Sequence, residues 1–163
     1  MTTTITDTEP RKNAASNFEP SRQLVTFYAD DFLLGVDIDY VQEISRQVEL
    51  TPVPGAPESI CGVINLRGEV VTVLNLHHLL GAKPLEPGAN WCNLILSFGA
   101  ERVGICVDRV SDICTVPENM IVDGPSNLRS LNSRYIEGVY LRDDAVVVIL
   151  DPMKLSEPSQ TVC

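Results

Sequence analysis

Short apolar runs alternate with polar or proline-containing segments along most of the chain. Runs of this kind that are rich in aromatic and β-branched residues are typical of β-strands. The pattern predicts strands at 24–29, 32–38, 61–66, 69–76, 93–98, 102–108, 111–116, 135–141 and 145–150. Hairpin turns are predicted between consecutive runs at Asp30-Asp31, Arg67-Gly68 and Asp143-Asp144. Short strands at close intervals with little helix indicate a small, all-β barrel or sandwich.

The segments between the strands predict one short helix, several loops and two tails. Asp39 is a suitable N-cap for a helix at 39–44, and Gln42, three residues later, completes a capping box. Proline and glycine predict loops at 49–60 and 83–90, and 118–133 is predicted to be irregular. Residues 1–22 have little to bury and are predicted to be a disordered tail, and 156–163 a C-terminal tail.

An internal repeat gives the chain a two-part organisation. Gly35, Asp39, Val41 and Ile44 align at a constant interval with Gly104, Asp108, Val110 and Ile113. In the same way Gly62, Val63, Val70, Leu74 and Asn75 align with Gly138, Val139, Val146, Leu150 and Asp151. The chain therefore contains one β-rich module twice, at about 23–80 and about 91–155. A module this small buries little apolar surface alone, so the two copies are expected to pack together and form a groove at their join.

The strand at 69–76 is apolar on both of its alternating sets, Val71 with Val73 and Val70 with Leu74. A strand with one face in water shows cleaner alternation. One set is therefore expected to fill a barrel, and the other to face the sister module or a partner.

The net charge of the chain limits the kinds of molecule that it can bind. The formal net charge is −10, and residues 1–22 carry equal numbers of acidic and basic side chains, so the acidic excess lies in 23–163. Such a surface repels nucleic acid and anionic membranes, since both are bound through Lys and Arg. No apolar run approaches the roughly 20 residues that span a bilayer, and no signal-peptide pattern is present. We expect a cytoplasmic protein whose partners are proteins with basic patches.

Catalytic and metal-binding patterns are weak. The five cysteines lack CxxC spacing and predict reduced thiols rather than a disulfide framework or zinc site. His77 and His78 are adjacent, so their side chains diverge and make a poor chelating pair. No metal or cofactor site is predicted. One alternative function is a small cytosolic hydrolase or redox enzyme that uses a cysteine, with Cys61 nearest in sequence, and one of these histidines.

Four features together resemble the CheW-like domain family of chemotaxis coupling proteins and chemotaxis kinases. They are the FLLGVDI run at 32–38, VQEI at 41–44, the proline-rich loop, and GVINLRG at 62–68 with the VV pair that follows. The similarity covers roughly 23–155.

The resemblance implies two packed five-stranded SH3-like barrels with short helices, in agreement with the repeat. It implies a non-catalytic adaptor without cofactors, which links methyl-accepting chemoreceptors to a CheA-type histidine kinase at membrane-associated receptor arrays. Receptor contacts of the family map onto Ile38, Val41, Glu43, Ile44 and Arg67, whereas kinase contacts cannot be assigned to single residues. A further alternative is a structural array protein that self-associates and binds neither kinase nor receptor strongly.

The chain departs from the family pattern after GVINLRG. The family usually carries a proline, then an aspartate, then an arginine, where this chain has Thr72, Asn75 and His77. Thr72 restores a backbone N–H and is expected to change edge-strand pairing at most. The loss of a charged pair is expected to alter which partner is accepted, as in a specialised chemosensory pathway such as twitching.

Overall fold

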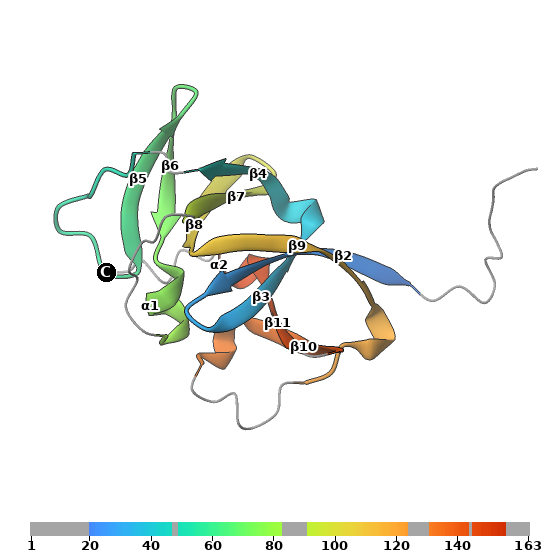
Figure 1. Ribbon diagram of the computed structural model, residues 1–163. Helices are drawn as coiled ribbons and strands as arrows, with labels where there is room; N and C mark the ends of the chain where they lie inside the picture. Colours follow the sequence, from blue (N-terminus) through green and yellow to red (C-terminus); the bar gives the residue numbers. More distant parts are fainter. Residues whose placement is uncertain (1–19, 47–48, 83–90, 124–130, 144, 156–163) are drawn as a thin grey trace, which may run out of the picture.

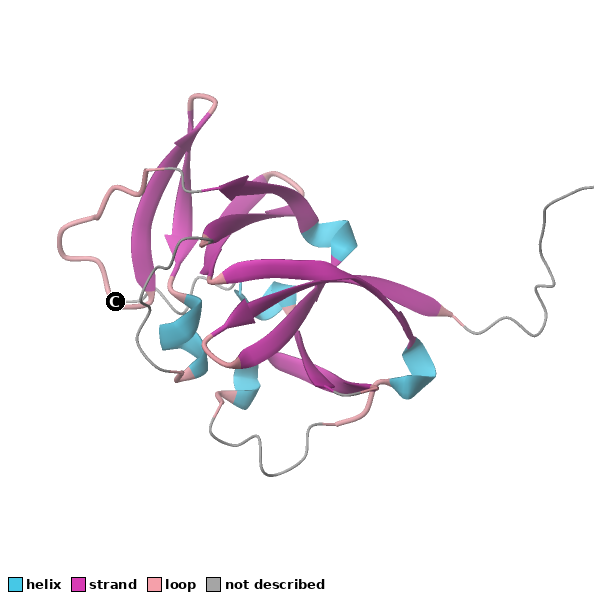
Figure 2. Ribbon diagram, viewed as in Figure 1, coloured by secondary structure: helices cyan, strands magenta, loops and turns pink. Residues whose placement is uncertain are grey.

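A computed structural model describes residues 20–46, 49–82, 91–123, 131–143 and 145–155 (Figure 1). Most of the described chain is β-strand, as Figure 2 shows in magenta. The strands are β2 (Ser21–Ala29), β3 (Phe32–Asp37), β4 (Val41–Arg46), β5 (Ile60–Leu66), β6 (Glu69–Leu74), β7 (Cys92–Phe98), β8 (Glu101–Val107), β9 (Arg109–Pro117), β10 (Ile136–Arg142) and β11 (Ala145–Leu150). The helical elements are α1 (Leu76–Leu80), α2 (Pro152–Leu155) and the 3-10 turns η1 (Ile38–Tyr40), η2 (Glu118–Met120) and η4 (Ser133–Tyr135).

All nine predicted strands are present, and the first starts earlier than expected. β2 begins at Ser21, so Ser21 and Arg22 belong to the sheet and not to the predicted tail. The rest of that tail, residues 1–19, the loop at 83–90 and the C-terminal tail lie outside the described residues.

The helix predicted at 39–44 is wrong. The carboxylate of Asp37, not Asp39, caps the short turn η1 by accepting a hydrogen bond from the Asp39 N–H at 2.9 Å. The chain then extends as β4 and pairs with β7 in an antiparallel register. Hydrogen bonds offered by a neighbouring strand outweigh a local capping signal, because strand preference depends on sheet context.

The ten strands form two five-stranded sheets, with strand orders β10-β11-β3-β2-β9 and β4-β7-β8-β6-β5. Each sheet takes two strands from one copy of the repeat and three from the other. The modules at 23–80 and 91–155 are therefore not separate barrels. The exchange occurs where the chain crosses between sheets, through η1 after β3 and at Asp108 after β8. We call β2, β3, β9, β10 and β11 the first barrel, and β4 to β8 the second barrel.

One isolated bridge closes each barrel between its two outer strands. Thr51, which follows β4, exchanges backbone hydrogen bonds of 2.8 and 2.9 Å with Val63 of β5. In the first barrel Val122, which follows β9, exchanges bonds of 3.0 and 2.8 Å with Val139 of β10. The repeat thus holds in three dimensions, because Val63 and Val139 are aligned positions.

Three apolar clusters fill the described part of the molecule. The largest lies between the barrels and draws on both, with Phe27, Leu34, Leu94, Ile105 and Leu150 among its fully buried side chains. A smaller cluster fills the inside of each barrel: Ile64, Val71, Val73 and Ile95 in the second, and Leu24, Val116, Val147 and Ile149 in the first. On β6, Val71 and Val73 fill the barrel and Leu74 joins the shared core, whereas Val70 is exposed.

In the described ranges, none of the helices combines the length and the apolar character needed to traverse a bilayer. The longest is α1, which has five residues.

Barrel closure predicts a large cost for replacing Gly62. Its φ is +155°, and a Cβ built there would lie 2.5 Å from the carbonyl oxygen of Thr51. Gly55 has a φ of +80° with no atom within 4 Å of the corresponding position, so it is a matched control. Gly55→Ala should lower the free energy of unfolding by about 1 kcal/mol through backbone strain alone. Gly62→Ala should cost about 1–3 kcal/mol more, because the closing bridge must shift. Urea denaturation measures both, and equal losses would show that the closing bridge tolerates a side chain.

Candidate partner-binding site

Two of the five predicted contact residues lie on the edge of the shared core. Ile38 in η1 and Val41 at the start of β4 are half-buried and pack against the cluster between the barrels. They mark the point where the chain crosses from the first barrel to the second. An apolar surface is therefore available beside the junction, although each side chain also serves the core.

Glu43 and Arg67 are brought together from opposite outer strands of the second barrel. The guanidinium of Arg67 donates to both carboxylate oxygens of Glu43, from Nη2 to Oε1 and from Nη1 to Oε2 at 3.4 Å. The Arg67 side chain is 66 % exposed and that of Glu43 is 26 % exposed. This hydrogen bonding raises the pKa of Arg67 above its ordinary value. A bidentate pair of this kind orients the guanidinium and leaves its remaining N–H groups at the surface.

The turn that carries Arg67 is unusually constrained. Arg67 has φ +53° and Gly68 has φ +88°, as two-residue hairpins of the I′ type require. A positive φ is uncommon for a residue with a side chain. The side chain of Asn65 supports the turn by accepting a hydrogen bond from the Gly68 N–H at 2.9 Å. Arg67 is thus displayed on a rigid tip, and its guanidinium is paired with Glu43 within the chain.

Ile44, the fifth predicted residue, is separated from this pair. It follows Glu43 directly on β4, and adjacent strand residues point to opposite faces. Its side chain is exposed. The structure therefore groups Glu43 with Arg67 and Ile38 with Val41, and places Ile44 on the other face of β4.

A related ion pair occurs in the first barrel. Arg142, at the end of β10, donates to Asp112 of β9 at 3.0 Å, and Asp112 occupies the repeat position of Glu43. The hydroxyl of Thr26 and then the guanidinium of Arg142 lower the pKa of Asp112. An arginine–carboxylate pair thus links the outer strands of both barrels.

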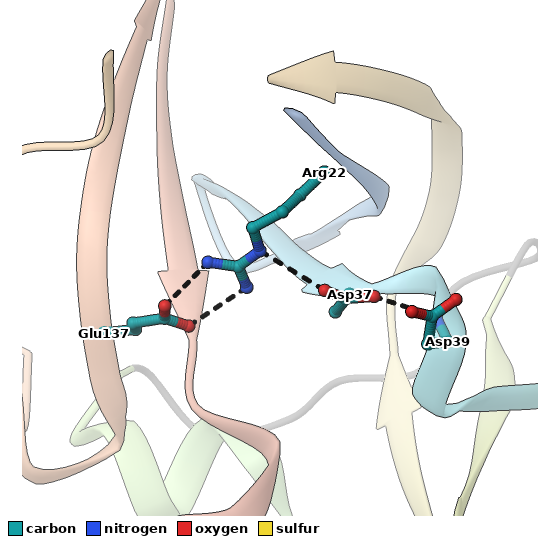
Figure 3. A network of polar contacts seen from close by, with 4 residues as sticks. All are labelled: Arg22, Asp37, Asp39 and Glu137. Carbon is teal, nitrogen blue, oxygen red and sulfur yellow. Dashed lines mark hydrogen bonds and ion pairs between the residues drawn. The ribbon is translucent and has the colours of Figure 1, made fainter. Parts of the chain in front are cut away.

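An acidic cleft adjoins Ile38 and was missed by the sequence analysis. Figure 3 shows Arg22 between Glu137 and Asp37; its guanidinium donates to both carboxylate oxygens of Glu137 at 2.6 and 3.1 Å and to Asp37 at 3.2 Å. Hydrogen bonding to Glu137 raises the pKa of Arg22. The cleft measures about 600 Å³ and is lined by Ser21, Arg22, Gln23, Asp37, Ile38, Asp39, Glu118 and Glu137. The only sequence signal was that Arg22 stands just before an apolar run.

The three departures from the family pattern have local structural roles. Thr72 lies on β6, which pairs with β5 and β8 and is therefore not an edge strand, contrary to the expectation. Asn75 caps α1 by accepting a hydrogen bond from the His78 N–H at 3.1 Å. His77 is only 3 % exposed, and its Nε2 lies 3.2 Å from Oδ1 of Asp108 at the crossover between the barrels.

The two histidines face different surroundings. His77 is buried against Asp108, whereas His78 is exposed and lies 3.5 Å from Glu58. Among the described residues no three His, Cys, Asp or Glu side chains gather in a way that would hold a metal ion.

The described cysteines lack the environment of a nucleophile. Burial raises the pKa of Cys61, Cys92 and Cys114, and it raises that of Cys106 to about 12. A catalytic cysteine needs the opposite shift, because the thiolate is the reactive form. The fifth cysteine, Cys163, lies outside the described residues.

Comparison with known proteins defines the class of protein. The family model described as the CheW-like domain matches residues 23–159. This span includes both barrels, and the chain therefore belongs to the CheW-like domain family.

Individual relatives agree with this assignment. The chemotaxis protein CheW of Treponema pallidum (strain Nichols) is 33 % identical over 138 residues, covering 82 % of this chain and 81 % of the relative. Protein FrzA of Myxococcus xanthus is 30 % identical over 116 residues, covering 71 % of this chain and 72 % of the relative.

A solved structure supports the fold. The crystal structure of the scaffolding protein TtCheW from Thermoanaerobacter tengcongensis is similar with a TM-score of 0.75 and 27 % identity. The match covers 86 % of this chain and 90 % of that one. The predicted fold of two five-stranded SH3-like barrels is confirmed.

The cysteine environments predict low thiol reactivity. At pH 7 a thiol with a pKa of about 12 is ionised on the order of a thousandfold less than a free cysteine. In a Cys163→Ser variant, which removes the one cysteine outside the described residues, Ellman's reagent should react with the folded protein at least about tenfold more slowly than with free cysteine. The rate should rise with pH as the thiolates form, and unfolding should expose every thiol. A thiol that reacts faster than free cysteine at pH 7 would revive the enzyme alternative.

Proposed function

We propose that this chain is a non-catalytic chemotaxis scaffold that couples chemoreceptor tips to a CheA-type histidine kinase in the cytoplasm, at membrane-associated receptor arrays. The observation that carries the proposal is the Glu43–Arg67 pair on the rigid hairpin of a CheW-like fold, together with apolar residues at the barrel junction. Relatives named as chemotaxis proteins and a scaffolding protein support the general role.

The geometry suits a helical partner such as a receptor tip. Half-buried apolar side chains at a junction accept one face of an amphipathic helix. Ile38 and Val41 would supply that contact, whereas Ile44, on the other face of β4, would lie outside it. Arg67 would set the register of the helix through charge-assisted hydrogen bonds, because its orientation is already fixed by Glu43. The acidic cleft beside Ile38 would favour basic residues on the same partner.

Coupling then requires no chemistry from this chain. A scaffold changes kinase activity by binding one kinase state more tightly than the other within a complex. The raised pKa of the described thiols supports a scaffold over a cysteine enzyme.

A co-sedimentation experiment tests the function directly. This protein is mixed with the CheA-type kinase and receptor signalling tips from the same cell, and both assembly and kinase autophosphorylation are measured. We expect the protein to enter the complex and to change the autophosphorylation rate. If it sediments with neither partner, the coupling function is wrong although the fold stands.

The hairpin residue provides a sharper prediction. Arg67→Glu should weaken receptor binding by well over tenfold, since it places two carboxylates together and removes the donor group. The fold should persist, because Arg67 lies on an exposed turn. Arg142→Glu is the matched control, since it breaks the related ion pair of the first barrel, and it should change receptor affinity less than about twofold.

A charge swap separates two roles for Arg67. The double variant Glu43→Arg/Arg67→Glu restores the internal ion pair with its polarity reversed. We expect receptor binding to stay weak, because the partner needs a cation at the tip. Recovery of affinity would mean that the receptor needs the ion pair and not a cation at position 67 itself.

A further inference from the structure

The two barrels share one backbone register, which allows their side chains to be compared position by position. Leu33 pairs with Tyr28 in the first barrel, and Arg102 pairs with Ser97 at the aligned positions of the second. In the parallel pairings, Gly35 lies opposite Ile149 and Gly104 lies opposite Val73, which again are aligned positions. Differences between aligned positions are therefore not imposed by the backbone.

At one end of the second barrel these positions are mainly polar. Five of them hold Ser97, Glu101, Arg102, Glu69 and Thr72, and two, Ala100 and Val70, are apolar. Arg102 and Glu69 form an ion pair across this end. Charged side chains therefore cover this end of the second barrel, as expected for a surface in contact with water.

The same end of the first barrel is apolar. The positions aligned with those five residues hold Tyr28, Phe32, Leu33, Ala145 and Val148. Together with Asp31 and Val146 they line a pocket of about 290 Å³. This volume lies just below the usual range for small-ligand sites, which begins at roughly 300 Å³, and suits a single large side chain.

An exposed apolar pair extends the pocket onto the surface. Leu141 of β10 lies opposite Val146 of β11, and they are 62 % and 42 % exposed. At the aligned position of Leu141 the second barrel has Asn65, a polar residue. Leu33 and Val148 are buried in the apolar clusters and serve the fold, whereas the exposed Leu141 and Val146 belong to none of these clusters. Exposed apolar surface that folding does not require indicates a contact with another molecule.

The charged residues at the rim of the pocket indicate which partner side chains would bind beside it. Asp31 lines the pocket, is exposed, and has no ion-pair partner among the described residues. Arg109 lies over the ring of Tyr28, with its guanidinium carbon 4.0 Å from the ring centroid, and so covers part of that ring already. A second cation from a partner would be attracted to Asp31.

We propose that this end of the first barrel is a docking pocket for an apolar side chain of a partner protein, which carries a neighbouring Lys or Arg that meets Asp31. The pocket lies on the first barrel and is separate in sequence from the Glu43–Arg67 pair of the second. It therefore does not depend on the proposed receptor contact, and the two can fail separately.

The test uses a dipeptide of the stated chemistry and the full isotope-labelled chain. N-acetyl-leucyl-lysinamide is titrated while backbone amide shifts are followed by NMR. We expect saturable shifts centred on Tyr28, Phe32 and Val146, with a dissociation constant of about 1–10 mM. The same dipeptide with Glu in place of Lys should bind at least about threefold more weakly, and Asp31→Asn should abolish this preference.

Matched variants locate the site. Val146→Asn removes apolar surface without changing the charge of the rim, and it should weaken binding at least about fivefold. Val70→Asn makes the same change at the aligned, exposed position of the second barrel and should leave affinity unchanged. Equal losses in both variants, shifts centred elsewhere, or no saturable shift up to about 50 mM dipeptide would overturn the proposal. If the Lys and Glu dipeptides bound the pocket equally well, the proposed role of Asp31 in attracting a cation would be wrong.

Discussion

The exchange of strands between the two copies of the repeat is the constraint on which the rest of the structure depends. Each barrel is incomplete without strands from the other copy, and the chain crosses between barrels at η1 and at Asp108. The largest apolar cluster therefore contains side chains of both barrels. Neither barrel can lose its packing without exposing the core of the other, so the junction between them is a fixed surface and not a flexible hinge.

Closure of the second barrel brings Glu43 and Arg67, which are distant in the sequence, into contact. β4 and β5 are the two outer strands of the second sheet, and the Thr51–Val63 bridge brings their edges together. Only this closure places Glu43 of β4 beside Arg67 at the tip of the β5–β6 hairpin. A scaffold must present its contacts at a defined spacing, because coupling depends on differential affinity for one partner state. In the function that we propose, the rigid turn and the bidentate pair would supply that spacing.

The two copies of the repeat share the same backbone framework but differ in their surface side chains. Aligned valines make both closing bridges, and both barrels join their outer strands with an arginine–carboxylate pair. One barrel end is closed by the Arg102–Glu69 ion pair, whereas the other holds an apolar pocket with Asp31 at its rim. A duplicated fold of this kind can hold two chemically different partners at a fixed distance, which is the arrangement that an adaptor needs.

The sequence by itself determined nine of the ten described strands, the hairpin turns, the repeat and the family, because these follow from local periodicity, turn residues and motifs. Only the tertiary structure decided how the strands pair. Separate and exchanged barrels bury the same apolar positions, so periodicity cannot distinguish them. The same limit explains why β4 was taken for a helix and why Arg22 was placed in a tail, since a neighbouring strand and the carboxylates of Asp37 and Glu137 come from distant parts of the chain. Glu43 and Arg67 were predicted singly, but their pairing arises from barrel closure, which no local pattern contains.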